Sequence, residues 1–191
     1  MYTFVNIYEY MYIYIFITMS MSTVQQVIPV IMAGGMGKRM NSDLPKVLHT
    51  ILGDPMIVRV IRTVLTIKPK KILVIVGKYR EIISKTLKEH FSKITDMFVL
   101  IDQLTPQGTG HALQCAIGAM NTFYHTKFVI LSGDVPLIST TLIDSICSFT
   151  DSNSVIVTTN MVDPSGYGRI IMRGGKFSHI VEEKDCSDEE R

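Results

Sequence analysis

The chain has 191 residues, a length that suits a single α/β domain. Its hydrophobic fraction of 47% is ample for a core, and its formal net charge of +2 at pH 7 supplies no large basic field of the kind that binds nucleic acid. The three cysteines show no Cys-x-x-Cys spacing, which indicates reduced thiols and a cytoplasmic setting.

Residues 1–22 form an apolar extension ahead of the first regular pattern. The extension holds no lysine or arginine, so it lacks the basic start of a signal peptide and the basic face of a membrane-surface anchor. Its most apolar part, residues 11–19, is shorter than the roughly twenty residues that cross a bilayer. β-Branched and aromatic residues favour a strand here. Because Met19 and Met21 are alternative starts, we leave open whether the extension belongs to the functional protein, and we place the domain at residues 23–191.

From residue 27 onward, apolar runs alternate with segments of helical spacing. The runs predict strands over residues 27–33, 71–76, 97–101, 128–131 and 155–160. The helical spacing predicts helices over residues 55–67, 80–91, 110–120 and 140–149, the last with Ser139 or Thr140 as N-cap. Glycines at 174 and 175 predict a hairpin between 170–172 and 176–181. We therefore expect a Rossmann-like, doubly wound α/β fold. Its sheet would be mostly parallel (mixed), with helices on both faces and ligands at the carboxyl ends of the strands.

A glycine-rich loop containing Gly34, Gly35 and Gly37 directly follows the first of these strands. Glycine has no Cβ, so backbone N–H groups in such a loop can approach a phosphate closely. Two cations, Arg39 and Lys46, follow within the same segment and suit a diphosphate or triphosphate. The sequence therefore predicts a phosphate-binding loop.

The spacing of this loop excludes two common types. A Walker loop begins with a glycine and has Ser or Thr after its lysine, whereas Met32 and Arg39 stand at those positions here. A dinucleotide-binding loop needs a third glycine where Met40 stands. The loop is of a third type, in which Lys46 follows a proline.

Four stretches, in order, resemble the sugar-1-phosphate nucleotidyltransferases, and most closely the uridylyltransferase domain of the bacterial N-acetylglucosamine-1-phosphate uridylyltransferases. They comprise residues 33–40 with 45–50, residues 103–112, residues 133–137, and residues 166–170 with 181–185. The Pro-Lys-Val-Leu-His segment at 45–49 is the most discriminating, because the glycines are shared by many nucleotidyltransferases. The resemblance implies a Rossmann-like fold of the nucleotidyltransferase type.

The resemblance implies uridylyl transfer from UTP to N-acetylglucosamine-1-phosphate, which gives UDP-N-acetylglucosamine and pyrophosphate. Such a reaction needs positioning and charge neutralisation rather than a protein nucleophile, because the attacking phosphate oxygen is already an anion. Arg39 and Lys46 would be the catalytic cations that contact and bridge the phosphates. Asp134, directly after a predicted buried strand, would hold Mg²⁺ together with substrate phosphates.

The same resemblance implies three groups of binding residues. Those for the nucleotide are Met32, Ala33, Gly34, Gly35, Gly37, Gln103, Gly108 and Thr109. The last three match positions that read uracil, and a glutamine amide can pair with an imide edge in both directions because it both donates and accepts. Those for the sugar are Gly133, Gly168 and Glu182. To His111, in the same motif as Gln103, we assign a structural role at the start of a helix.

In the family, the chain continues past the position of Arg191 with asparagines for the sugar and the metal. We therefore expect a domain with an incomplete sugar-binding lobe, which a second chain could complete. Two alternatives to the uridylyltransferase remain open. One is an inactive nucleotide-binding remnant of the family. The other is a pyrophosphorylase for another sugar-1-phosphate or another nucleotide.

Overall fold

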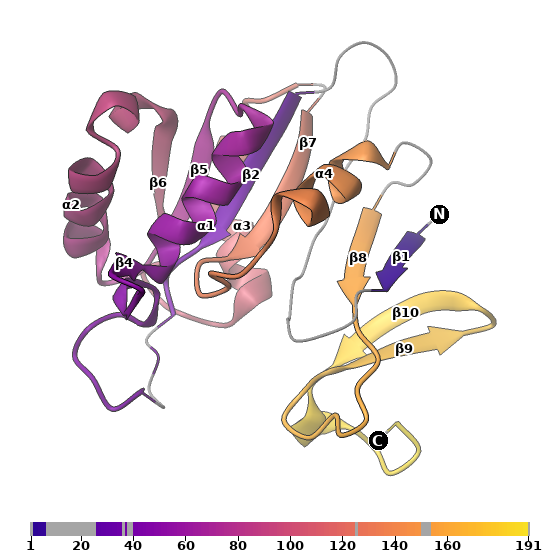
Figure 1. Cartoon of the computed structure of the whole chain (residues 1–191). Coiled ribbons are helices and arrows are strands. Elements are labelled where there is room, and N and C mark those ends of the chain that lie inside the picture. Colours follow the sequence, from indigo (N-terminus) through magenta and orange to yellow (C-terminus); the bar gives the residue numbers. More distant parts are fainter. Residues whose placement is uncertain are drawn as a thin grey trace.

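The computed structural model describes residues 2–6, 26–35, 37, 40–124, 126–149 and 154–190. Its centre is a four-stranded parallel sheet with the strand order β6–β5–β2–β7 (Figure 1). These strands are β2 (Gln26–Met32), β5 (Ile72–Val76), β6 (Phe98–Asp102) and β7 (Thr126–Ser132). The predicted doubly wound α/β class is confirmed, with strand boundaries within two residues of the expected ones.

Strands β5 and β6 differ in burial. Every residue of the inner strand β5 is buried, which explains why its sequence is an unbroken run of Ile, Leu and Val. Strand β6 lies at an edge of the sheet, and none of its five residues is fully buried. The sheet is thus covered on both faces near its centre and more open at β6.

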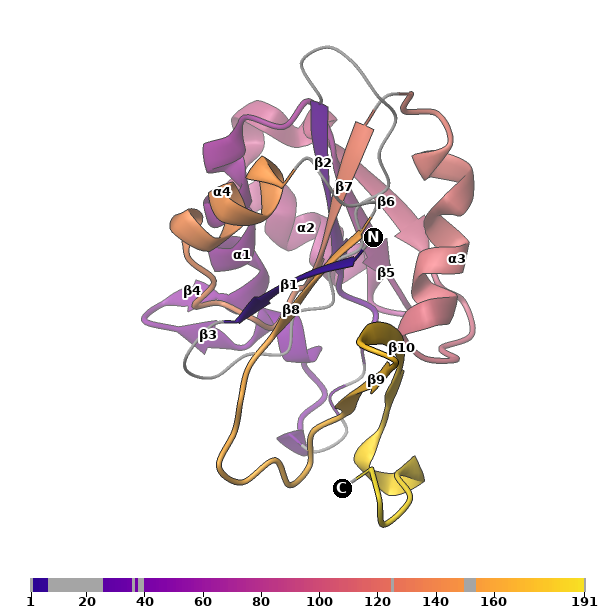
Figure 2. The same cartoon turned by 90° about the vertical axis from the view of Figure 1, so that its right-hand side faces the viewer.

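Helices pack on both faces of this sheet, as Figure 2 shows. They are α1 (Met56–Val64), α2 (Arg80–His90), α3 (Thr109–Met120) and α4 (Thr140–Ser148). Buried residues of α1, α2 and α4 share one core with the side chains of Ile31, Val74 and Val129. On the opposite face α3 packs Ala112 and Ala116 against the sheet. Because successive side chains of a strand point to opposite faces of the sheet, they contribute to two separate cores.

A helix cap and a short hairpin complete this part of the chain. Ser139 caps α4, since its hydroxyl accepts a hydrogen bond of 3.1 Å from the N–H of Leu142, as predicted. A small antiparallel pair, β3 (Thr50–Ile51) and β4 (Asp54–Pro55), precedes α1 and was not expected from the sequence. Between these two strands Leu52 and Gly53 both have positive φ, which is the backbone of a tight hairpin turn.

Strand β8 (Ser154–Thr158) does not join the central sheet. It pairs in parallel with β1 (Tyr2–Asn6), so a part of the N-terminal extension forms a strand, in line with its composition. Val155 and Val157 of β8 still contribute to the core beneath α1 and α4. The remainder of the 1–22 extension lies outside the described residues.

The predicted hairpin is confirmed as β9 (Arg169–Arg173) and β10 (Lys176–Val181), which pair antiparallel. Gly174 and Gly175 both adopt positive φ, as a two-residue hairpin turn requires. Both views place this hairpin beyond the end of the sheet at which β2 and β7 finish (Figures 1 and 2). Within the described residues, no helix is both long and apolar enough to cross a membrane.

Candidate functional site at the carboxyl ends of β2 and β7

Strands β2 and β7 run side by side and end together. Met32 and Ser132 are register partners, and the N–H of Gly133 donates to the carbonyl oxygen of Met32 at 2.9 Å. The glycine-rich loop (residues 33–46) therefore leaves the sheet next to Gly133 and Asp134. This is the shared edge that the sequence predicted for the two motifs.

An ion pair joins the two motifs across this edge. The ammonium group of Lys46 lies 2.5 Å from Oδ2 of Asp134, and the hydroxyl of Ser132 donates to Oδ1 of the same carboxylate. Burial alone would raise the pKa of Asp134, but the hydrogen bonds from Lys46 and Ser132 outweigh it and hold that pKa below its ordinary value. The carboxylate is therefore held ionised at the end of β7.

The position of Lys46 follows from its neighbours. It begins a single turn of 3-10 helix, Lys46–Leu48, in which Val47 and Leu48 are buried and anchor the segment in the core. Gly37 packs against it from the other side of the loop, with φ at +57°, and a Cβ on Gly37 would lie 2.9 Å from Cβ of Lys46. Only glycine satisfies both the positive φ and the contact, so the loop holds Lys46 in place.

On the other side of β2, Gly34 lies against Gln103. A Cβ on Gly34 would stand 3.2 Å from Oε1 of Gln103 and 3.3 Å from the backbone N of Gly77. Gln103 is tied to the end of β5 by its N–H, which donates to the carbonyl oxygen of Val76 at 2.7 Å, and the residue is only 5% exposed. The loop after β2 and the loop after β6 are thus in direct contact, as a nucleotide site spanning both would require.

The Gln103 amide is itself hydrogen-bonded within the protein. Its Nε2 donates to the carbonyl oxygen of Gly108 at 3.2 Å and lies 3.1 Å from Nδ1 of His111. Gly108 has φ at +96° and forms the N-cap of α3, whose first residue is the exposed Thr109. The predicted base-reading residues therefore form one connected group at the start of α3.

The remaining predicted nucleotide residues differ in exposure. Ala33 is buried, and its N–H donates to the carbonyl oxygen of Ile75 at 2.7 Å; Met32 is half-buried. Gly35 is exposed, with no atom of the described residues within 4 Å of where a Cβ would stand. Arg39, the second predicted catalytic cation, lies outside the described residues.

Gly133 has a packing role. A Cβ there would lie 3.1 Å from the carbonyl oxygen of Met32 and 3.1 Å from Cγ1 of Val47. The absence of a side chain is thus required by the close approach of β2 and the 3-10 turn. Its predicted contact with a sugar stays a prediction.

The other two predicted sugar residues lie at the ends of the β9–β10 hairpin. Gly168 precedes β9, and the exposed Glu182 follows β10. The neighbouring Glu183, for which no role was predicted, accepts a hydrogen bond of 2.5 Å from the N–H of Gly166, and its other oxygen lies 3.8 Å from Arg169. Glu183 therefore fixes the loop before β9, while no described residue forms an ion pair or hydrogen bond with the carboxylate of Glu182.

The residues present suit a magnesium ion only if the substrate supplies further ligands. Among the described residues there is no group of three or more His, Cys, Asp or Glu side chains that could hold a metal. Asp134 offers one carboxylate, and Mg²⁺ is commonly bound by one or two carboxylates together with substrate phosphates. Asp134 therefore fits such an ion, provided that Lys46 yields part of its contact with the carboxylate.

A family model for the MobA-like NTP transferase domain matches residues 29–169. The chain belongs to this family. The matched region begins in β2 and ends at the first residue of β9, so it includes Lys46, Gln103 and Asp134 but not Glu182. The resemblance predicted from the four sequence stretches is confirmed at the level of the family.

Two relatives align with most of this chain. It is 41% identical over 165 residues to the probable UDP-N-acetylglucosamine pyrophosphorylase of Acanthamoeba polyphaga mimivirus, a match that covers 84% of this chain and 64% of the viral protein. It is 37% identical over 169 residues to the bifunctional protein GlmU of Mycolicibacterium gilvum, which covers 85% of this chain and 33% of that protein. The chain thus spans less than two thirds of the first relative and about a third of the second.

A solved structure supports the fold. The crystal structure of Rv0371c from Mycobacterium tuberculosis H37Rv matches with a TM-score of 0.51 at 14% identity, covering 66% of this chain and 61% of that one. At this identity the likeness concerns the arrangement of the elements alone.

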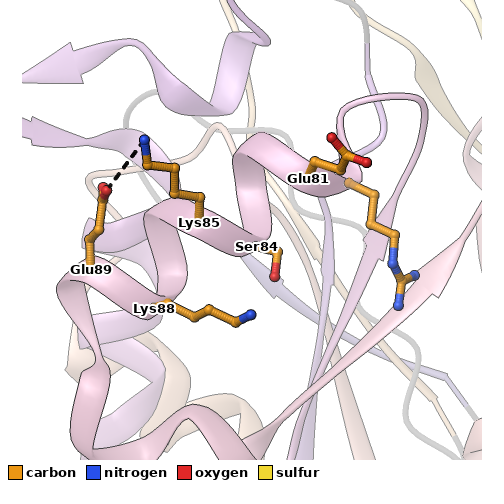
Figure 3. Close-up of a pocket in the computed structure, with 6 residues that line it drawn as sticks. Glu81, Ser84, Lys85, Lys88 and Glu89 are labelled. Carbon is orange, nitrogen blue, oxygen red and sulfur yellow. Dashed lines mark ion pairs between the residues drawn. The ribbon is translucent and has the colours of Figure 1, made fainter.

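A hollow of about 530 Å³ on the outer face of α2 is separate from these motifs (Figure 3). Its lining comes from one helix and consists of Arg80, Glu81, Ser84, Lys85, Lys88 and Glu89. Charges of both signs are mixed there, and Lys85 pairs with Glu89 at 3.9 Å. A solvated helix face explains this arrangement, and we assign it no function.

Proposed function

We propose that this chain transfers a uridylyl group from UTP to N-acetylglucosamine-1-phosphate, and that residues 23–191 form the transferase domain. The observation that carries the proposal is the Lys46–Asp134 ion pair at 2.5 Å. It joins the predicted phosphate-binding loop to a carboxylate at the carboxyl end of the sheet. The identity of 41% to a probable UDP-N-acetylglucosamine pyrophosphorylase supports this choice of substrates.

In the proposed reaction a phosphate oxygen of the sugar phosphate attacks the α-phosphorus of UTP. The new P–O bond forms as the bond between the α-phosphorus and the bridging oxygen breaks, and that oxygen leaves with pyrophosphate. Lys46 would neutralise charge on the phosphates, and Arg39 would stabilise the departing pyrophosphate. The glycine-rich loop would hold the phosphates with backbone N–H groups. Gln103, Gly108 and Thr109 would bind the base.

Asp134 would bind Mg²⁺ jointly with the phosphates of the substrate, and the ion would supply further charge neutralisation when bound. With the ion bound, the ammonium of Lys46 would shift from the carboxylate toward the phosphates, because the ammonium and Mg²⁺ would compete for the oxygens of Asp134. Gly133, Gly168 and Glu182 would contact the sugar, with the Glu182 carboxylate accepting hydrogen bonds from hydroxyl groups.

The experiment is an initial-rate assay of pyrophosphate release by the purified chain with UTP and Mg²⁺. The sugar phosphates to compare are N-acetylglucosamine-1-phosphate, glucose-1-phosphate and galactose-1-phosphate, with Asp134→Asn as the inactive control. We expect release only with the first. Release with another sugar phosphate, or with CTP in place of UTP, would support the second alternative. No release, with UTP still raising the melting temperature, would support the nucleotide-binding remnant.

A further inference from the structure

The hydrogen bonding of Gln103 limits what this residue can offer a ligand. A primary amide has two N–H hydrogens and one acceptor oxygen. The carbonyl oxygen of Gly108, 3.2 Å away, can only accept, so the nitrogen of the amide must face it. This fixes which end of the amide is nitrogen on chemical grounds, because the reverse orientation would set two oxygens against each other.

The second hydrogen of the amide has a partner too. Nδ1 of His111 lies 3.1 Å from the same nitrogen, and with Nε2 of Gln103 as donor this ring nitrogen must be the acceptor. His111 therefore carries its ring proton on Nε2. The sulfur of Cys115 lies 4.0 Å from both ring nitrogens and does not distinguish them. Both hydrogens of the amide are thus used within the protein.

Only the oxygen of the amide is left. Oε1 lies on the side of Gly34, where a Cβ would stand 3.2 Å away, and among the described residues no donor is hydrogen-bonded to it. Glycine at position 34 keeps this oxygen accessible from the loop after β2. Gln103 therefore presents a single acceptor to whatever lies against Gly34.

We propose that His111 is a positioning residue that makes Gln103 an acceptor-only reader of the base, selecting uracil over cytosine. The proposal rests on the proposed function in one respect, that a nucleotide base lies against Gln103. Uracil presents an N–H at position 3, which can donate to Oε1. Cytosine held in the same pose presents a lone pair there, which repels the oxygen. This revises the sequence-based view that the glutamine pairs with the imide edge in both directions.

The experiment measures dissociation constants of UTP and CTP for the full chain and for three variants by calorimetry. His111→Phe removes the acceptor, so one amide hydrogen is freed and the orientation of Gln103 loosens. The net value of one hydrogen bond, about 0.5–1.5 kcal/mol, corresponds to a fall of roughly twofold to tenfold in the preference for UTP. His111→Asn can place a carbonyl oxygen where Nδ1 stands and should restore the preference to within about twofold. Gln114→Ala, an exposed change on the same helix, should leave it unaltered.

Two results would overturn the inference while the proposed function stands: an unchanged preference for UTP in His111→Phe, or equal behaviour of the Phe and Asn variants. Binding of neither nucleotide by the unaltered chain would contradict the proposed function itself, and the base-reading role with it. Nitrogen-15 spectra of the ligand-free chain give a separate check. We expect the proton of the His111 ring on Nε2, and a proton on Nδ1 would overturn the hydrogen-bond arrangement.

Discussion

Lys46 and Asp134 form an ion pair of 2.5 Å, although one belongs to the loop after β2 and the other follows β7. The carboxylate is mostly shielded, with 22% of its side chain exposed, whereas 45% of the lysine side chain is exposed. The ammonium group is therefore the more accessible of the two charges to a ligand. The pair links a partly exposed cation with a shielded anion at the predicted phosphate site.

Loss of either charge should greatly reduce turnover with little effect on folding. We expect Lys46→Met and Asp134→Asn each to lower the rate of uridylyl transfer by at least about a hundredfold, because each removes stabilisation of charge in the transition state. The free energy of unfolding should change by no more than about 1 kcal/mol, as is usual for a partly exposed pair. Rates and urea unfolding curves would be compared with Lys85→Met, which breaks an exposed pair on α2. Near-native rates in both site variants would contradict the assignment.

The Asp134 pair also has a pH signature. Since the pKa of Asp134 is lowered in the folded chain, its contribution to stability is present above the ordinary carboxyl pKa of 3.8 and is lost as the pH falls through the lowered value. We expect the stability difference between the native chain and Asp134→Asn to be constant near neutral pH and to shrink in acid. Urea unfolding at a series of pH values measures this difference. A difference in stability that grows as the pH falls would contradict a lowered pKa for Asp134.

Comparing Gly37→Ala with Gly53→Ala separates the cost of a positive φ from the effect of crowding Lys46. Gly37→Ala places a Cβ 2.9 Å from Cβ of Lys46 and adds the cost of a positive φ, roughly 1–2 kcal/mol. Gly53→Ala is a matched control, because Gly53 also has positive φ but no atom of the described residues lies within 4 Å of the new Cβ. Both variants should lose stability, whereas only Gly37→Ala should weaken UTP binding. Equal binding by the two variants would refute the contact's role.

Lys127 should matter for stability, not for binding. It is buried on β7, and its ammonium donates to the carbonyl oxygens of Cys147 and Phe149, both at 2.8 Å, at the end of α4. Lys127→Met leaves these carbonyls without their donor, and we expect a loss of about 1–3 kcal/mol in urea unfolding. Lys71→Met, which removes a single exposed bond to Asp96, should cost at most about 0.5 kcal/mol. Similar losses in the two variants would show that burial does not increase the contribution of the Lys127 hydrogen bonds to stability.

Much of this arrangement follows from local sequence patterns. Parallel strands end at one edge, so the order of strand and loop along the chain was enough to predict that the loop after β2 and Asp134 meet. The individual strands of the sheet, its helices and the hairpin turn at Gly174 and Gly175 were predicted from periodicity and glycine placement. These features depend on short stretches of chain.

Features that leave no periodic or motif signal in the sequence were not predicted. The pairing of β1 with β8 has no local signal, because composition favours a strand without specifying its neighbour. The hairpin of β3 and β4 has two residues per strand, too few for any alternation to be visible. The hydrogen bonds of Gln103 to Gly108 and His111 depend on how the start of α3 returns to β6, and the motif alone does not reveal which hydrogens are used.

Transfer of label from UTP to the sugar nucleotide is the defining step of the proposed reaction. The full chain would be incubated with UTP labelled at the α-phosphorus, N-acetylglucosamine-1-phosphate and Mg²⁺, and the products separated. We expect label in UDP-N-acetylglucosamine, with one pyrophosphate released per labelled product and no transfer by Asp134→Asn. Label that stays in UTP, or that appears only in UMP, would contradict the proposed reaction.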